Sequence, residues 1–299
     1  NSCMNGMTYV KSCFMRTGRL LFPLLASLPM LSNASPDVVP ELNPKTGFME
    51  CQLTTEYQAG PALVQILLPD HLDRSKKYPV LYILPVEGIR SAFGHGLVEA
   101  QKADIANKYG VICVYPIFNK ASPWYGNHAT DPTLRQEDYV VKALVPFINS
   151  KYPTQSDKEG RWLIGFSKSA WGAFTLLFRH PDVFGYAAGW DGPLMLDGSG
   201  KDWGPMGLSV NFGTKEAMMQ NLPTTLANEN ASWLKERPRL VLGLGKFWAG
   251  HVKKMETLLQ TAGIPHAYRD DLTVDHRWDT GWFPPMVDEL VKTARAPQT

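Results

Sequence analysis

Short, continuous apolar runs alternate with amphipathic segments along most of the chain. Apolar runs of this length, bounded by turn residues, are typical of strands buried on both faces of a sheet. The runs are Tyr78–Leu84, Val111–Tyr115, Trp162–Gly165, Gly185–Gly189, Leu240–Leu244 and His266–Arg269. The segments with apolar residues at helical spacing are Leu97–Tyr109, Tyr139–Lys151, Ala170–Arg179, Val252–Ala262 and Met286–Ala294. Strand followed by helix, repeated, predicts an α/β fold with a mostly parallel central sheet and helices on both faces.

Two regions depart from this alternation. Phe48–Tyr57 and Leu63–Leu68 follow a Pro/Asn-rich stretch and read as additional strands. Leu194–Glu236, rich in Gly, Met and Asn, has no regular period. We expect it to form an irregular, lid-like insertion over the carboxyl edge of the sheet, where α/β folds bind ligands. No linker divides the chain after the leader, so residues 35–299 are expected to form one domain.

Charge and cysteine content exclude several classes of function. The 299 residues include 30 Lys+Arg and 28 Asp+Glu, a formal net charge of +2, with no long basic run. Nucleic-acid binding is therefore not expected. Four cysteines without a CxxC pair are too few for a disulfide scaffold and predict no metal site.

Residues 1–34 have the pattern of a leader. A basic segment from Met15 to Arg19 precedes the apolar run Leu20–Leu31 and a small-residue exit that ends at Ala34. This pattern is typical of a secretory signal peptide. A short membrane anchor is the alternative, but a span needs about 20 apolar residues and this run is shorter and contains two prolines. We expect cleavage near Ala34, a secreted or periplasmic protein, and no stable membrane span.

Gly165-Phe166-Ser167-Lys168-Ser169 is the strongest local signal for chemistry. It is a variant of the G-x-S-x-G nucleophile elbow and lies between a predicted strand and a predicted helix, as that motif requires. A side chain at the position of Gly165 would collide with neighbouring backbone at so sharp a turn. The following helix directs its amino end at Ser167, which favours developing negative charge. The alternative is a serine that only caps the helix.

The chain resembles the α/β-hydrolase superfamily, and within it the putative-esterase group of S-formylglutathione hydrolases, feruloyl esterases and mycolyltransferase-like enzymes. The matching pieces run in the family's order and cover nearly all the chain after Thr46. They are Tyr78–Leu84, Glu137–Tyr139 with Val145–Ile148 and Tyr152–Pro153, Gly165–Ala173, Arg179–Phe184 and His276–Trp282. The resemblance implies a Ser–acid–His triad acting in ester hydrolysis or acyl transfer.

Seven histidines are candidates for the base. The resemblance favours His276, because it follows the last predicted strand and stands ahead of a Trp, as the family's histidine does. His95 and His251 lie where they could reach the active-site edge, but neither occupies the family's base position.

An oxyanion hole needs two backbone N–H groups aimed at one oxygen. Lys168, directly after the nucleophile, is expected to give one. The loop after Tyr78–Leu84 is expected to give the other, but Pro85 stands where the family usually has His-Gly and has no N–H. We therefore assign the second donor to Val86, with Glu87 as the alternative.

The triad acid departs from the family pattern. The family usually carries an Asp in the loop after Leu240–Leu244, and this chain has no carboxylate there. Asp191 follows the preceding strand, a position that some lipases of the superfamily use. A turn-forming Asp before Gly192 is the alternative reading. Asp275 and Asp279 lie too close to His276 in sequence to orient it easily.

We therefore expect a secreted serine hydrolase that cleaves carboxylic esters through Ser167, His276 and Asp191, without a cofactor. Trp124 and Tyr125 are expected either to line an acyl or aromatic pocket or to pack at its rim. The substrate is expected to be a small-molecule or carbohydrate-linked ester. Acyl transfer, peptidase action and a catalytically silent binding module on the same fold remain alternatives.

Overall fold

The computed structural model describes residues 38–88, 91–119, 123–200 and 202–297. These residues all fall within one compact unit. The leader predicted for residues 1–34 and its cleavage near Ala34 lie outside the described residues. Among the helices of these ranges, none combines the length and apolar character needed to span a bilayer.

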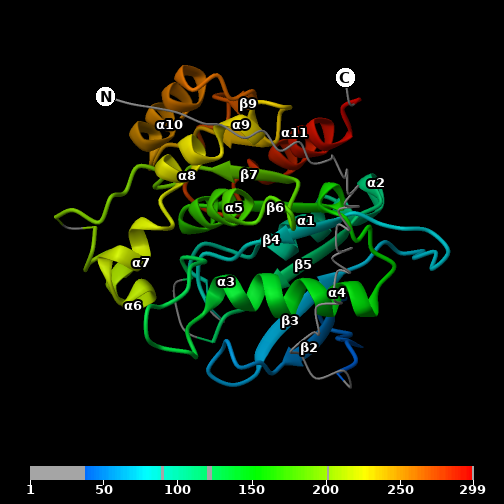
Figure 1. Ribbon diagram of the computed structural model, residues 1–299. Coiled ribbons are helices and arrows are strands. Elements are labelled where there is room, and N and C mark those ends of the chain that lie inside the picture. Colours follow the sequence, from blue (N-terminus) through cyan, green and yellow to red (C-terminus); the bar gives the residue numbers. More distant parts are fainter. Residues whose placement is uncertain (1–37, 89–90, 120–122, 201, 298–299) are drawn as a thin grey trace, which may run out of the picture. The chain divides into compact units, whose positions relative to one another are not determined.

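Nine strands of the described chain form one sheet in the order β1-β2-β3-β5-β4-β6-β7-β8-β9 (Figure 1). The pairs from β1 to β3, and β3 with β5, are antiparallel; the pairs from β5 through β9 are parallel. This arrangement confirms the predicted mostly parallel sheet. The strands are β1 (Glu41–Leu42), β2 (Met49–Leu53), β3 (Ala62–Leu67), β4 (Val80–Ile83), β5 (Ile112–Pro116), β6 (Arg161–Phe166), β7 (Tyr186–Trp190), β8 (Leu240–Gly243) and β9 (His266–Arg269).

The strand β6 lies inside the sheet and is buried along its whole length. Leu163 pairs with residues of β4 and β7. The side chain of Leu163 packs in the core on one face of the sheet, and the side chain of Ile164 packs in the core on the opposite face. Because both faces are covered, every residue of such a strand is buried and the sequence shows a continuous apolar run.

Helices cover both faces of the sheet. On one face, residues of α5 (Lys168–Arg179) join one core, and on the other, residues of α11 (Phe283–Arg295) join the second core. The remaining helices are α1 (Gly96–Lys102), α2 (Ile105–Tyr109), α3 (Gln136–Asp138), the π-helical η1 (Tyr139–Leu144), α4 (Val145–Lys151), the 3-10 turn η2 (Lys158–Gly160), α6 (Leu208–Phe212), α7 (Lys215–Met219), α8 (Pro223–Glu229), α9 (Ala231–Leu234) and α10 (Ala249–Thr261).

The structure corrects two details of the predicted elements. The segment Leu97–Tyr109 forms two helices, because Asp104 between them has a φ of 53°, which ends a right-handed helix. The segment Leu194–Glu236 is not irregular throughout: it contains α6 to α9. These helices are only four to seven residues long, too short to show a clear helical period in the sequence.

Candidate active site

Ser167 occupies the sharp turn between β6 and α5. Its φ of 54° and ψ of −131° are a strained conformation for a residue with a side chain. A Cβ at Gly165 would lie 2.3 Å from the carbonyl oxygen of Ser169, so the predicted need for glycine there is confirmed. Ser169, where the usual motif has glycine, is fully buried, and its hydroxyl bonds both the N–H and the carbonyl of Phe166, at 3.0 and 2.8 Å. The turn therefore accepts this small side chain.

His276 contacts a buried carboxylate. Its Nδ1 lies 2.7 Å from Oδ2 of Asp191, which is fully buried. The same oxygen accepts the backbone N–H of Phe247 at 3.1 Å, and Oδ1 accepts that of Trp248 at 2.7 Å. Three donors thus fix this carboxylate, and a hydrogen bond to Nδ1 leaves Nε2 as the imidazole nitrogen available to a substrate or nucleophile.

Aromatic rings enclose the imidazole of His276. The ring centroid of Phe166 lies 5.0 Å away, edge to face, and that of Phe247 lies 4.9 Å away in a stacked arrangement. The two carboxylates that flank His276 in sequence are engaged elsewhere: Asp275 pairs with Lys246 at 2.9 Å and Asp279 with Arg277 at 2.8 Å. Asp191 is therefore the carboxylate that holds the imidazole.

A cavity of about 420 Å³ opens between these elements. Most of its lining side chains are apolar, and Ser167 and His276 both face it. The lining residues are Val86, Phe93, Ser167, Lys168, Pro205, Met206, Gly207, Phe247, Trp248 and His276. The cavity is thus lined by the nucleophile elbow, the loop that carries His276, the loops after β4 and β8, and one short stretch of the Leu194–Glu236 region.

The two residues assigned to the oxyanion hole line this cavity. Val86 follows β4 and Lys168 begins α5, so two separate elements bring them to Ser167. Within the described residues, neither backbone N–H donates a hydrogen bond to the protein. Both groups are therefore available to a ligand oxygen.

The expected direct contact of Trp124 and Tyr125 with a ligand is not seen, because both side chains are fully buried and neither lines the cavity. Both side chains instead form hydrogen bonds to backbone carbonyls of the cavity wall or of the residue next to it. Tyr125 donates its hydroxyl to the carbonyl of Pro85, next to Val86, and Trp124 donates its indole N–H to the carbonyl of Met206 at 3.1 Å. Of the two alternatives for this pair, the structure agrees with packing beside the pocket rather than with lining it.

The cavity wall contains residues that the sequence analysis did not assign. Phe93, Met206, Phe247 and Trp248 come from three loops far apart in the chain. The available signal was that Phe247 and Trp248 follow the strand Leu240–Leu244 at the carboxyl edge, where α/β folds bind ligands.

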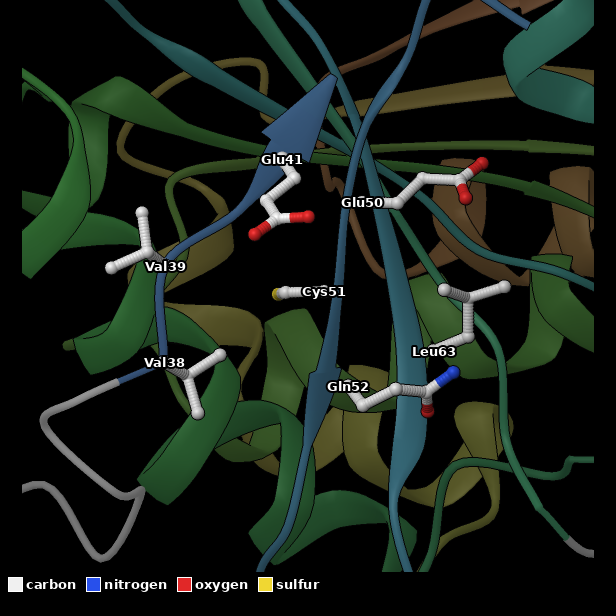
Figure 2. Close-up of a pocket in the computed structure, with 7 residues that line it drawn as sticks. All are labelled: Val38, Val39, Glu41, Glu50, Cys51, Gln52 and Leu63. Carbon is white, nitrogen blue, oxygen red and sulfur yellow. The ribbon is translucent and has the colours of Figure 1, made fainter. Parts of the chain in front are cut away.

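Figure 2 shows a second hollow, of about 440 Å³, beside β2 and remote in the sheet order from β6. Its lining residues are Val38, Val39, Glu41, Glu50, Cys51, Gln52 and Leu63. Burial raises the pKa of the Cys51 thiol to about 11, so this cysteine remains protonated and unreactive near neutral pH. In the described part of the chain, no three His, Cys, Asp or Glu side chains are grouped as a metal site would require.

Known proteins are similar to this chain in sequence and in fold. Residues 58–244 match the model of the family described as Putative esterase. An esterase of Mycobacterium tuberculosis (strain ATCC 25618 / H37Rv) is 28% identical over 136 residues, which cover 44% of this chain and 29% of that protein. The matched stretch thus spans less than a third of that relative's length.

Two solved structures have the same fold. An S-formylglutathione hydrolase from Agrobacterium tumefaciens has a TM-score of 0.67 at 15% identity, covering 86% of this chain and 99% of that one. The fluorophosphonate-binding serine hydrolase FphF from Staphylococcus aureus has a TM-score of 0.60 at 16% identity, covering 88% and 100%. These matches confirm the α/β-hydrolase fold, and since the family model spans more than half of the sequence, the chain belongs to the Putative esterase family.

Proposed function

We propose that this protein is a serine hydrolase of carboxylic esters, with Ser167 as nucleophile, His276 as base and Asp191 as the orienting acid. The observation that carries the proposal is the placement of Ser167 and His276 on one cavity, with the fully buried Asp191 bonded to the far side of the imidazole. This is the arrangement by which an imidazole activates a hydroxyl.

The proposed reaction has two halves. Ser167 Oγ attacks the ester carbonyl carbon while His276 Nε2 takes its proton, giving a tetrahedral oxyanion that the N–H groups of Val86 and Lys168 stabilise. When the C–O bond breaks, His276 returns the proton to the departing alcohol and an acyl-serine remains. Water then attacks this acyl group by the same route, and the acid and free Ser167 are released. No cofactor takes part.

The same acyl-serine also forms in acyl transfer and in peptide cleavage, so those reactions are enzymatic alternatives. A small-molecule or carbohydrate-linked ester fits a mostly apolar cavity of about 420 Å³. A silent binding module on this fold is the alternative from another class.

Labelling with a fluorophosphonate separates an enzyme from a silent module. We expect the folded protein to be labelled and to hydrolyse p-nitrophenyl esters. Ser167→Ala should lose both properties, with turnover falling on the order of 10⁴-fold or more. Ser199→Ala, at an exposed serine, is the matched control and should keep both. Labelling of Ser167→Ala equal to that of the control would contradict the assignment of the nucleophile.

We also propose that the protein is exported and cleaved near Ala34. The basic segment, the apolar run Leu20–Leu31 and the small exit residues support this. Amino-terminal sequencing of protein recovered from the periplasm or medium should give a start near Ser35. Folded, exported protein that keeps its leader would count against the proposal.

A further inference from the structure

Among the described residues that line the catalytic cavity, Lys168 is the one with an amine or guanidinium side chain. Most of the other lining side chains are apolar, including Phe93, Met206, Phe247 and Trp248. A cation in an apolar wall is costly unless an anion faces it, because burial removes the water that would solvate the charge. The placement therefore needs an explanation from the cavity's ligand.

No carboxylate of the described chain forms an ion pair with Lys168. Burial lowers the pKa of its ammonium group, and the field of Glu87 opposes this without reversing it. Glu87 is itself engaged, since its Oε2 accepts the N–H of Ala92 at 2.8 Å. Glu87 therefore offsets part of the charge of Lys168 through its field, but it forms no ion pair with the ammonium group.

Backbone groups on this side of the cavity add to the positive field of Lys168. The 12-residue helix α5 begins at Lys168, and its amino end carries a partial positive charge. The free N–H groups of Val86 and Lys168 add to the same field. A neutral ester would leave the partly desolvated ammonium without a partner, whereas an ester with an anionic substituent would supply one.

From this geometry we propose that the preferred substrates are esters carrying a negatively charged group, such as a carboxylate, and that the Lys168 ammonium recognises that group. The charge can belong to the acyl part or to the alcohol part of the ester. The inference rests on the proposed function and specifies the substrate class of the same site.

Two matched ester pairs test the inference and locate the charge. For the acyl side, 4-nitrophenyl hydrogen glutarate is compared with 4-nitrophenyl pentanoate; for the alcohol side, 4-acetoxybenzoate is compared with 4-acetoxybenzamide. The measured quantity is the ratio of kcat/KM for the anionic ester to that for its neutral partner. We expect this ratio to exceed one in at least one pair and to fall about tenfold or more in Lys168→Met, a loss of about 1.4 kcal/mol.

Three controls separate a charge effect from a structural one. Lys168→Arg should keep most of the ratio, because it keeps the charge. Glu87→Gln should raise the ratio, because it removes the opposing charge and still accepts the N–H of Ala92. With the unaltered protein alone, the ratio should fall between low salt and 0.5 M NaCl.

The possible results distinguish the two proposals. Hydrolysis of all four esters, with ratios that neither Lys168→Met nor salt changes, would overturn the charge inference and leave the proposed function standing. Hydrolysis of none of them by the unaltered protein would count against both.

Discussion

Replacement of Asp191 by Asn changes the charge that holds His276 with almost no change in shape. The carboxylate accepts the imidazole N–H and the N–H of Phe247 at Oδ2, and that of Trp248 at Oδ1. Asn keeps one acceptor oxygen and replaces the other with an NH₂ group, which only donates. The three contacts can therefore not all survive in either orientation of the amide.

The two orientations damage the site differently. With the amide oxygen at the Oδ2 position, His276 keeps its tautomer and Trp248 N–H faces a donor. With NH₂ at that position, His276 Nδ1 must accept, Nε2 carries the proton, and the imidazole cannot act as base. In both orientations the imidazolium formed during the reaction loses its negative partner. We expect the esterase rate at neutral pH to fall by roughly 10²–10⁴-fold, or about 2.7–5.4 kcal/mol.

The fold should survive this change. One buried donor left without an acceptor costs about 1–3 kcal/mol, which lowers Tm by several degrees without unfolding the protein. Kinetics with p-nitrophenyl esters and a thermal melt are measured together for Asp191→Asn and Asp275→Asn. Asp275 is the control, because its side chain is 76% exposed and pairs only with Lys246 in the described structure. A near-normal rate for Asp191→Asn, with a crippled Asp275→Asn, would refute the assignment of the acid.

Three further outcomes are expected. Gly165→Ala places a Cβ 2.3 Å from the carbonyl oxygen of Ser169, so kcat should fall more than tenfold and the free energy of unfolding by about 1–3 kcal/mol. Gly204→Ala is the control, because the space around Gly204 is open, and it should change neither quantity. Equal effects in the two variants would refute the steric argument. Phe247→Ala removes the ring stacked on His276 but keeps the backbone N–H that bonds Asp191. We expect kcat to fall on the order of tenfold, with a smaller change in Tm. An unchanged kcat would show that the ring does not position the imidazole. Burial lowers the pKa of His95 from 6.5 to about 4, so below pH 6.5 the unfolded chain binds a proton that the folded chain does not. Lowering the pH from 7.5 to 5.0 should therefore reduce the free energy of unfolding, measured with urea, by about 2 kcal/mol. His95→Gln should lack that part of the loss and the exposed His71→Gln should retain it; the same loss in both variants would contradict this.

The sheet could be predicted because its physics is local. A strand covered on both faces must be apolar at every position, and this gives a run that the sequence shows directly, as in Leu240–Leu244 for β8. The nucleophile elbow could also be predicted from the sequence, because the sharp turn requires a small residue at Gly165 and this requirement does not depend on distant parts of the chain.

The cavity wall could not be predicted in the same way. Its residues come from loops whose spacing in sequence says nothing about their distance in space, as with Phe93 and Phe247. Burial of the aromatic pair Trp124 and Tyr125 depends on carbonyl acceptors more than 35 residues away, at Pro85 and Met206. The short helices of Leu194–Glu236 are stabilised by packing rather than by their own period, so they too needed tertiary information.

The position of Asp191 follows from what the neighbouring loop supplies. A Cβ at Gly245 would lie 2.3 Å from Cβ and Cγ of Asp191, so the loop after β8 passes close enough only because that residue is glycine. This close approach brings the N–H groups of Phe247 and Trp248 onto the two carboxylate oxygens. In this chain, the loop after β7 therefore supplies the carboxylate and the loop after β8 supplies the amides that hold it. A carboxylate added to that loop would place a second negative charge beside a fully buried one, which explains physically why the loop from Leu244 to Trp248 carries none.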